Sequence, residues 1–149
     1  MPRQSHYHKV IASSKTIEEA LSSRGGENPY KGECYVASSL LYDAYQGKDM
    51  QLRKGRDHEG RWHWWIEVWD GQEYKTLDMT RNQYLLEGHP CPSDQDGGVK
   101  AKPMSYPSYE RRKKSLAEEI TRSLIGTRME RRSTRETNAH QESRKGPTA

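Results

Sequence analysis

Phenylalanine is absent from this chain of 149 residues, and Leu, Ile and Val together number only 18. So low an aliphatic content excludes a large hydrophobic core and, taken alone, is typical of disordered chains. The 4 Trp and 9 Tyr all lie before residue 110, however, and each ring can bury on the order of 150–250 Å². We therefore predict one domain, over residues 1–126, with a small core rich in aromatic side chains.

No apolar run in the chain approaches the roughly 20 residues that a membrane helix needs. The N-terminal residues also lack the apolar segment of a signal peptide. We therefore expect a cytoplasmic protein that does not associate with a membrane. Cys34 and Cys91 are the only cysteines, too few for a disulfide framework, and in a reducing compartment both are expected to be free thiols.

Positive charge is concentrated at the C-terminal end of the chain. Residues 110–149 carry 11 Lys and Arg against 6 Asp and Glu, whereas the remainder is nearly neutral. From Thr127 onward there is no aromatic or branched aliphatic residue, so this segment cannot contribute to a core. We predict that residues 127–149 form a disordered basic tail, which would bind nucleic acid at most weakly and without specificity.

Capping residues and apolar periodicity predict four helices. The first begins with a capping box at Thr16. The clearest begins at Cys34 and ends near Gly47, because its apolar residues recur at helical spacing. A short helix is predicted at residues 80–86, and a final one over about residues 109–125.

Two strands are predicted to form a hairpin. Residues 62–69 and 72–78 are rich in residues that favour strands, and Asp70-Gly71 between them is typical of a two-residue turn. A short edge strand is predicted at residues 50–53. Together, helices and antiparallel strands predict an α+β fold.

The predicted core spans about residues 16–86. Residues 87–108 contain four prolines and three glycines with little periodicity, and we expect them to form a long loop. With a two-residue turn, His63 lies directly opposite Asp78 in the hairpin, where paired Cβ atoms are about 4.5–5.5 Å apart. The helix that begins at Cys34 would pack on the face that carries His63. The other face would carry the apolar residues Trp64, Ile66, Val68 and Leu77.

This arrangement suggests a cysteine nucleophile. A thiol is mostly protonated at neutral pH, and a helix N-terminus or an adjacent imidazolium favours its thiolate form. Cys34 would meet the first condition and His63 the second. Asp78 would hold the imidazole in the useful tautomer, while His63 serves as counterion and later protonates the leaving group. We expect these three residues to form a catalytic site without a metal or a cofactor.

A Cys at the start of a helix, followed by a His and an Asp on successive strands, resembles the papain-like and transglutaminase-like superfamily. The resemblance covers residues 28–86. Within it, the segments Gly32–Ser38, His63-Trp64 and Leu77–Thr80 with Gln83 also resemble small uncharacterised phage and prophage proteins. The superfamily implies a small core in which the Cys-bearing helix packs on an antiparallel sheet.

The resemblance also implies a reaction. Such a site would hydrolyse an amide, isopeptide or thioester bond of a protein or peptide-like substrate, or transfer the acyl group to an amine. Papain-like enzymes often place a Gln shortly before the Cys to stabilise the oxyanion, and no Gln stands in that position here. We therefore take Asn28, Tyr30 and Trp65 as candidates for oxyanion or substrate binding. A phage-encoded protein would act in the host cytoplasm.

A zinc site is one alternative. The residues available to it are Cys34, His58, His63 and Cys91. Their spacing matches no common zinc finger, in which paired ligands lie two to five residues apart. His6 and His8 are instead interpreted as polar residues of a loose N-terminus, and Cys91, between two prolines, as an exposed loop thiol.

Two further functions are considered. Four Trp within eight positions, together with a basic tail, suggest a single-strand nucleic-acid binder, although alternation along the strand divides the rings between its two faces. The other is a non-catalytic phage protein that modulates a host factor and retains a degenerate site. A much faster reaction of Cys34 than of Cys91 with a thiol-directed electrophile would favour the enzyme over the binding protein.

Overall fold

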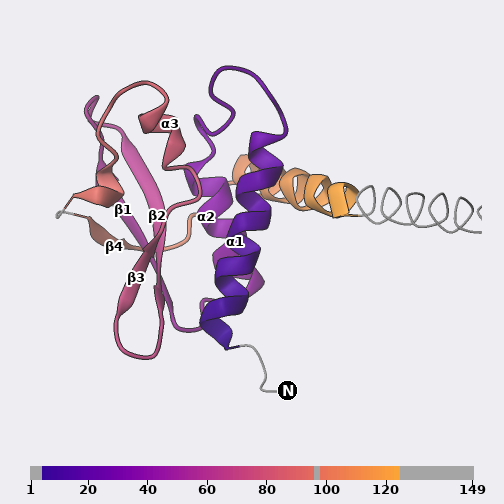
Figure 1. Ribbon diagram of the computed structural model, residues 1–149, viewed down its shortest axis with the longest axis vertical. Helices are drawn as coiled ribbons and strands as arrows, with labels where there is room; N and C mark the ends of the chain where they lie inside the picture. Colours follow the sequence, from indigo (N-terminus) through magenta and orange to yellow (C-terminus); the bar gives the residue numbers. More distant parts are fainter. Residues whose placement is uncertain (1–4, 96–97, 125–149) are drawn as a thin grey trace, which may run out of the picture.

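The computed structural model describes residues 5–95 and 98–124. It consists of helices and a four-stranded antiparallel sheet (Figure 1). The strand order is β3-β2-β1-β4. The longer helices lie together on one side of the sheet (Figure 1). The fold is therefore α+β, as the sequence predicted.

The N-terminal helix α1, His6–Ser22, begins well before its predicted start at Thr16. Ser5 caps it, because its side chain accepts a hydrogen bond from the third helical residue. The capping-box motif at Thr16 therefore lies inside the helix and does not mark its start. A buried stripe runs along α1 and holds it against the core; its members are Val10, Ser14, Ile17, Ala20 and Leu21.

The first turn of α1 contains His6 and His8, so the prediction of a loose N-terminus is wrong. Nε2 of His6 lies 2.7 Å from the carbonyl oxygen of Lys48. The backbone N–H of His8 donates to Oγ of Ser5 at 3.2 Å. These bonds hold the first turn and join it to the loop before residue 50.

Helix α2, Cys34–Ala44, starts at the predicted residue and packs on the two central strands. Helix α3, Asn82–Leu85, is a single turn. Residues 107–124 form the final helix, close to its predicted start. Leu116 of this helix is fully buried, and Lys113 Nζ lies 2.7 Å from a carboxylate oxygen on α2.

The two central strands are β1, Met50–Arg56, and β2, Trp62–Trp69. β1 pairs along its whole length with β2 and, on its other side, with β4. It is therefore an interior strand, and the predicted short edge strand is corrected. The edges of the sheet are β3, Tyr74–Leu77, and β4, Val99–Ala101.

The predicted long loop over residues 87–108 contains regular structure. A 3₁₀ turn, η1, spans Pro92–Asp94 and precedes β4. β4 is only three residues long, too short for a periodic signal in the sequence. Its pairing with β1 nevertheless draws the segment around Cys91 back across the sheet.

The β2–β3 hairpin has a longer turn than the sequence predicted. Trp69 pairs with Tyr74 and not with Gln72, so residues 70–73 form the turn. The Asp70 carboxylate stabilises this turn by accepting hydrogen bonds from two of its backbone N–H groups. The register is therefore shifted by two residues from the predicted one.

The core lies between the helices and one face of the sheet. That face carries Leu52, Ile66 and Val68, each at most 2% exposed. His63 and Trp65 alternate with these residues and therefore face the other side of the sheet. The prediction that α2 packs on the face of His63 is wrong, because the few aliphatic side chains of the strands draw the helices to their own face.

Two features concern the whole chain. Within residues 5–95 and 98–124, no helix has the length and apolarity that crossing a membrane requires. The predicted basic tail over residues 127–149 lies outside the described residues.

Candidate functional site

His63 projects from β2, and its side chain is fully buried. Its ring stacks on Trp65, with centroids 5.8 Å apart, and meets the Tyr84 ring edge-on at 4.9 Å. Its partner across the β1–β2 ladder is Gly55, which adds no side chain. The imidazole therefore sits in an aromatic enclosure that excludes water.

Asp78 directly follows β3, whose last residue, Leu77, pairs with Ile66. His63 and Asp78 are therefore not directly opposite each other, and the predicted pairing is wrong. A shift of two residues keeps both side chains on the predicted face, however. They meet there, with Nε2 of His63 2.6 Å from Oδ2 of Asp78.

The Asp78 carboxylate accepts several further hydrogen bonds. Oδ2 accepts from Ser93 Oγ at 2.6 Å and from Cys91 Sγ at 3.3 Å, and Oδ1 accepts from the backbone N–H of Thr80 at 3.1 Å. Burial alone would raise the pKa of Asp78, but the hydrogen bonds from His63, Ser93 and Cys91 outweigh it and lower the pKa. The carboxylate therefore remains ionised inside the protein.

The same network determines the charge of His63. Burial alone would lower the pKa of His63, but hydrogen bonding with Asp78, Cys34 and Cys91 outweighs burial and raises the pKa to about 12. The ring is therefore an imidazolium at neutral pH. A positive charge in contact with a thiol favours the thiolate form.

Cys34 is the first residue of α2 and is partly exposed. The free N–H groups of the helix N-terminus therefore lie at its backbone. The preceding residue, Glu33, would oppose a negative charge on the sulfur, but its carboxylate pairs with Arg24 and Arg112, each at 3.2 Å. The structure thus joins His63 to the Asp78 carboxylate, and Cys34 is among the groups that raise the pKa of His63.

Gln83 is a further polar residue of this site that was not among the predicted site residues. Its Nε2 lies 2.9 Å from Nδ1 of His63, on the other side of the ring from Asp78. Its Oε1 accepts from the Gly32 N–H at 3.4 Å. The amide therefore fixes the ring at its second nitrogen. The only sequence signal of Gln83 was a capping-box spacing, whereas its side chain faces the imidazole.

None of the three candidates for oxyanion or substrate binding lines the cleft of Cys34. Asn28 donates from Nδ2 to the backbone carbonyl of Gln83 at 2.8 Å and so braces the loop before Cys34. Tyr30 is 8% exposed and belongs to the core, which uses aromatic rings where aliphatic residues are scarce. Trp65 is 2% exposed and stacks on the imidazole. Gln83, not these three, lines the cleft beside Cys34.

Cys91 is 1% exposed, so the prediction of an exposed loop thiol is wrong. Its sulfur lies 3.8 Å from Nε2 of His63 and 3.1 Å from Oγ of Ser93. The pairing of β4 with β1 brings the segment to this position. The flanking prolines gave no sign of such a long-range contact.

One group of described residues places metal-ligating atoms within 4.8 Å of one another. It consists of His63, Asp78 and Cys91. It differs from the zinc set considered from the sequence, since His58 instead stacks on His89, with centroids 3.7 Å apart. The 2.6 Å between Nε2 and Oδ2 is a hydrogen-bond distance, shorter than the roughly 3.3 Å between two ligands of a tetrahedral zinc. The cluster therefore fits a hydrogen-bonded network better than a metal site.

Cys34 opens into a cleft of about 170 Å³. Gln83, Tyr84 and Trp62 also line it. The Tyr84 hydroxyl donates to Oδ2 of Asp57 at 2.9 Å, and burial together with this bond raises the pKa of Tyr84. The phenol therefore stays protonated at neutral pH.

The charged side chains at this cleft are paired with one another. Lys31 Nζ lies 2.8 Å from Glu87, and a guanidinium nitrogen of Arg61 lies 3.1 Å from Glu59. The cleft therefore combines a partly exposed thiol with internally neutralised walls. Its dimensions suit a narrow chain or a single side chain.

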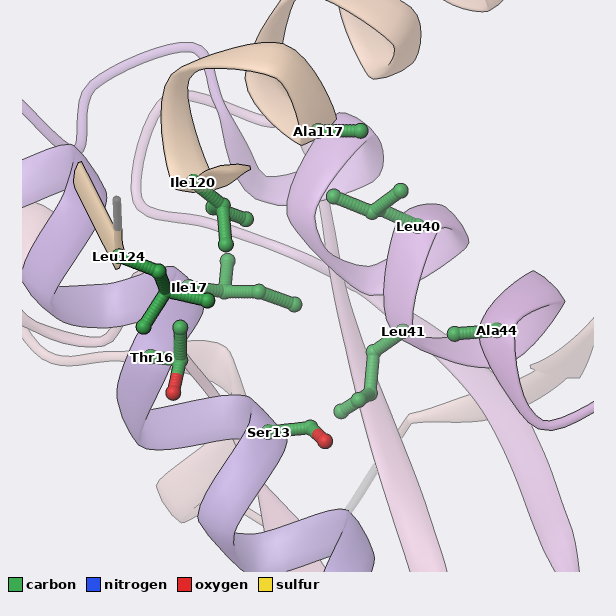
Figure 2. Close-up of a pocket in the computed structure, with 9 residues that line it drawn as sticks. All are labelled: Ser13, Thr16, Ile17, Leu40, Leu41, Ala44, Ala117, Ile120 and Leu124. Atoms are coloured by element: carbon green, nitrogen blue, oxygen red, sulfur yellow. The ribbon is translucent and has the colours of Figure 1, made fainter. Parts of the chain in front are cut away.

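A larger hollow of about 330 Å³ lies between α1, α2 and the final helix, away from the cleft (Figure 2). Ile17, Ile120 and Leu124 converge on it. Among the described residues that line it, the polar side chains are the hydroxyls of Ser13 and Thr16, and none is suited to acid–base chemistry. The chemistry of the molecule is concentrated in the smaller cleft.

The fold and the site are those of an α+β protein with a buried His63–Asp78 pair. The buried thiol of Cys91 contacts this pair, and the second thiol, Cys34, is partly exposed. The model of the YunG protein family matches residues 6–124. The chain therefore belongs to the YunG family, and the match includes every residue of the site. Searches of the curated proteins and of the solved structures found no match.

Proposed function

We propose that this protein is a cysteine-dependent hydrolase or acyltransferase that acts on an amide, isopeptide or thioester bond. The observation that carries the proposal is the buried His63 ring, held by Asp78 at 2.6 Å, whose pKa is raised by Asp78 and by the neighbouring Cys34. The order of Cys, His and Asp along the chain supports a papain-like or transglutaminase-like mechanism. A protein or peptide-like chain is the proposed substrate.

In the first step, the Cys34 thiolate attacks the carbonyl carbon, and the carbonyl oxygen takes up the negative charge. His63 then gives a proton to the leaving amine or thiol as the bond to the carbonyl carbon breaks. The product is an acyl thioester on Cys34 and a neutral imidazole.

In the second step, neutral His63 takes a proton from water or from an acceptor amine, which attacks the thioester and releases the acyl group. Asp78 stays ionised throughout and stabilises the imidazolium in both steps. The backbone N–H groups at the start of α2 are placed to stabilise the oxyanion. Both cysteines are free, which supports action in a reducing compartment, and we infer the cytoplasm.

Acyl transfer to Cys34 can be tested with p-nitrophenyl acetate, an activated ester that requires no knowledge of the substrate. We expect a burst of p-nitrophenol of about one equivalent per protein, and a single acetyl group on the Cys34 peptide by mass spectrometry. Cys34→Ser should abolish the burst, whereas Cys91, which is 1% exposed, should carry no acetyl group in the wild type. Acetylation no faster than that of the unfolded protein would refute the proposed function.

A further inference from the structure

Trp62 carries two cations beside the cleft of Cys34. The ring is 41% exposed. The Arg56 guanidinium lies over it, with Cζ 3.8 Å from the ring centroid, and Lys54 Nζ lies 4.6 Å from the same centroid. Such contacts hold long cationic side chains in place at the surface. Two positive charges are therefore fixed next to the residue that precedes His63.

These two cations have no ion-pair partner among the residues that the structure describes. In the part of the chain that the structure describes, no carboxylate lies within ion-pair distance of Lys54 or Arg56. Two neighbouring arginines do have carboxylate partners. Arg53 pairs with Glu67, and Arg61 pairs with Glu59. The positive charge over Trp62 is therefore available to a ligand.

The Arg56 side chain presents a free edge. Its Nη1 donates to the carbonyl oxygen of Gly60 at 2.9 Å, while the flat face of the guanidinium rests on Trp62. The remaining N–H groups lie in the plane of the guanidinium, which is the geometry that binds a carboxylate through two parallel hydrogen bonds. Stacking thus orients Arg56 without using up its donors.

Trp62 also lines a second hollow, of about 270 Å³. Arg56, Gln95 and Val99 are among its other lining residues, and none of the described residues that line it carries a carboxylate. Trp62 lines both this hollow and the cleft of Cys34, so the two adjoin at this side chain. A chain attacked at Cys34 would place its next groups here.

We propose that Arg56 and Lys54, held on Trp62, form a subsite for a carboxylate of the substrate, namely the acidic side chain of a peptide-like chain whose acyl carbon lies at Cys34. This assignment rests on the proposed function and adds a substrate preference to it. Of the acidic groups nearer to Cys34, Glu87 pairs with Lys31 at 2.8 Å, and the Asp57 carboxylate is held by hydrogen bonds from the Tyr84 hydroxyl and from two backbone N–H groups. The cations on Trp62 have no carboxylate partner among the described residues.

The subsite can be tested through the charge of small thiol reagents. Cys34 is allowed to react with two methanethiosulfonates of similar size, the anionic 2-sulfonatoethyl compound and the cationic 2-trimethylammonioethyl compound. The modification rates are read by mass spectrometry of the Cys34 peptide. We expect the anionic reagent to react faster. The anionic-to-cationic rate ratio should fall roughly 1.5- to 5-fold in Arg56→Gln and again in Lys54→Gln, as for exposed charge pairs.

The control is Lys75→Gln, which removes the same charge at the opposite end of the β2–β3 hairpin and should leave the ratio unchanged. His63 also attracts anions, so the comparison among variants, and not the wild-type preference alone, decides the result. Equal loss in the control, or an unchanged ratio in both subsite variants, would overturn the proposal. Failure of both reagents to modify Cys34 would overturn it as well, because the subsite would then not adjoin the thiol.

This experiment separates the subsite from the proposed function. The intrinsic reactivity of Cys34 cancels in a ratio of two rates at one thiol. A charge preference that depends on Arg56 would therefore persist even if the acetylation burst were absent. A burst without such a preference would support the enzyme and refute the subsite.

Discussion

Nε2 of His63 lies 2.6 Å from Oδ2 of Asp78, although the two residues are not partners in the sheet. β3 ends at Leu77, and Asp78 reaches the ring from just beyond the strand. Both groups are buried, and each stabilises the charged form of the other. The stability of the fold and the reactivity of the site therefore depend on the same pair.

Asp78→Asn should strongly destabilise the protein. The substitution leaves a buried imidazolium without its counterion, and loss of one partner of a buried pair costs about 3–5 kcal/mol of unfolding free energy. Urea denaturation at pH 7 measures the change. Asp94→Asn is the control, because it breaks an exposed pair with Arg81, which is worth less than about 1 kcal/mol. Equal effects of the two substitutions would contradict the account.

The contribution of His63 to stability should decrease as the pH rises. The pKa of His63 is raised from 6.5 to about 12 in the folded protein, so below about pH 6.5 the folded and unfolded states are both protonated and the contribution is full. Above that pH only the folded state keeps the proton, and the contribution falls by up to about 1.4 kcal/mol per pH unit until it is lost near pH 12. Unfolding free energies of the wild type and His63→Gln at pH 6, 7.5 and 9 should therefore converge. A constant difference would show that His63 is neutral when folded.

The two thiols should differ in accessibility. Cys34 is partly exposed and Cys91 is 1% exposed, so Ellman's reagent should modify one thiol of the native protein quickly and the second only on unfolding. Cys34→Ser should remove the fast phase. Rapid modification of both cysteines in native buffer would show that the segment around Cys91 does not cover the site.

Helix and hairpin positions could be predicted from the sequence because their signals are local. The apolar spacing after Cys34 located α2, and the run from Trp62 to Trp69 located β2. The contact of His63 with Asp78 was also expected, although the predicted turn was two residues too short. That error did not matter for the face of the sheet, because an even shift in register leaves side chains on the same side.

The remainder of the site depends on contacts that are distant in the sequence. Cys91 and Ser93 reach Asp78 only because a three-residue strand pairs with β1, and nothing local marks that strand. Gln83 faces the imidazole because α3 packs over it, whereas its spacing in the sequence is that of a helix cap. Such residues follow from packing, which periodicity alone does not determine.

The final helix should be essential for stability and the segment beyond it should not. Leu116 is fully buried, and its replacement by Ala should cost about 2–5 kcal/mol. Deletion of residues 127–149, which contain no aromatic or branched aliphatic residue, should leave the thermal midpoint unchanged within error. Thermal and urea unfolding of the two variants, compared with the full chain, measure both effects. A large decrease in the thermal midpoint after deletion of residues 127–149 would show that this segment stabilises the fold.

The central claim is that His63 activates Cys34, and the dependence of alkylation rate on pH tests it most directly. Iodoacetamide modification is followed for each cysteine separately by mass spectrometry in the wild type, His63→Ala and Asp78→Asn, with the fold of each variant checked by its thermal midpoint. We predict that Cys34 reacts readily well below the pKa of a free thiol, about 8.5, that Asp78→Asn slows or shifts this reaction, and that His63→Ala abolishes it. Identical profiles in all three proteins, matching that of an ordinary thiol, would contradict the account.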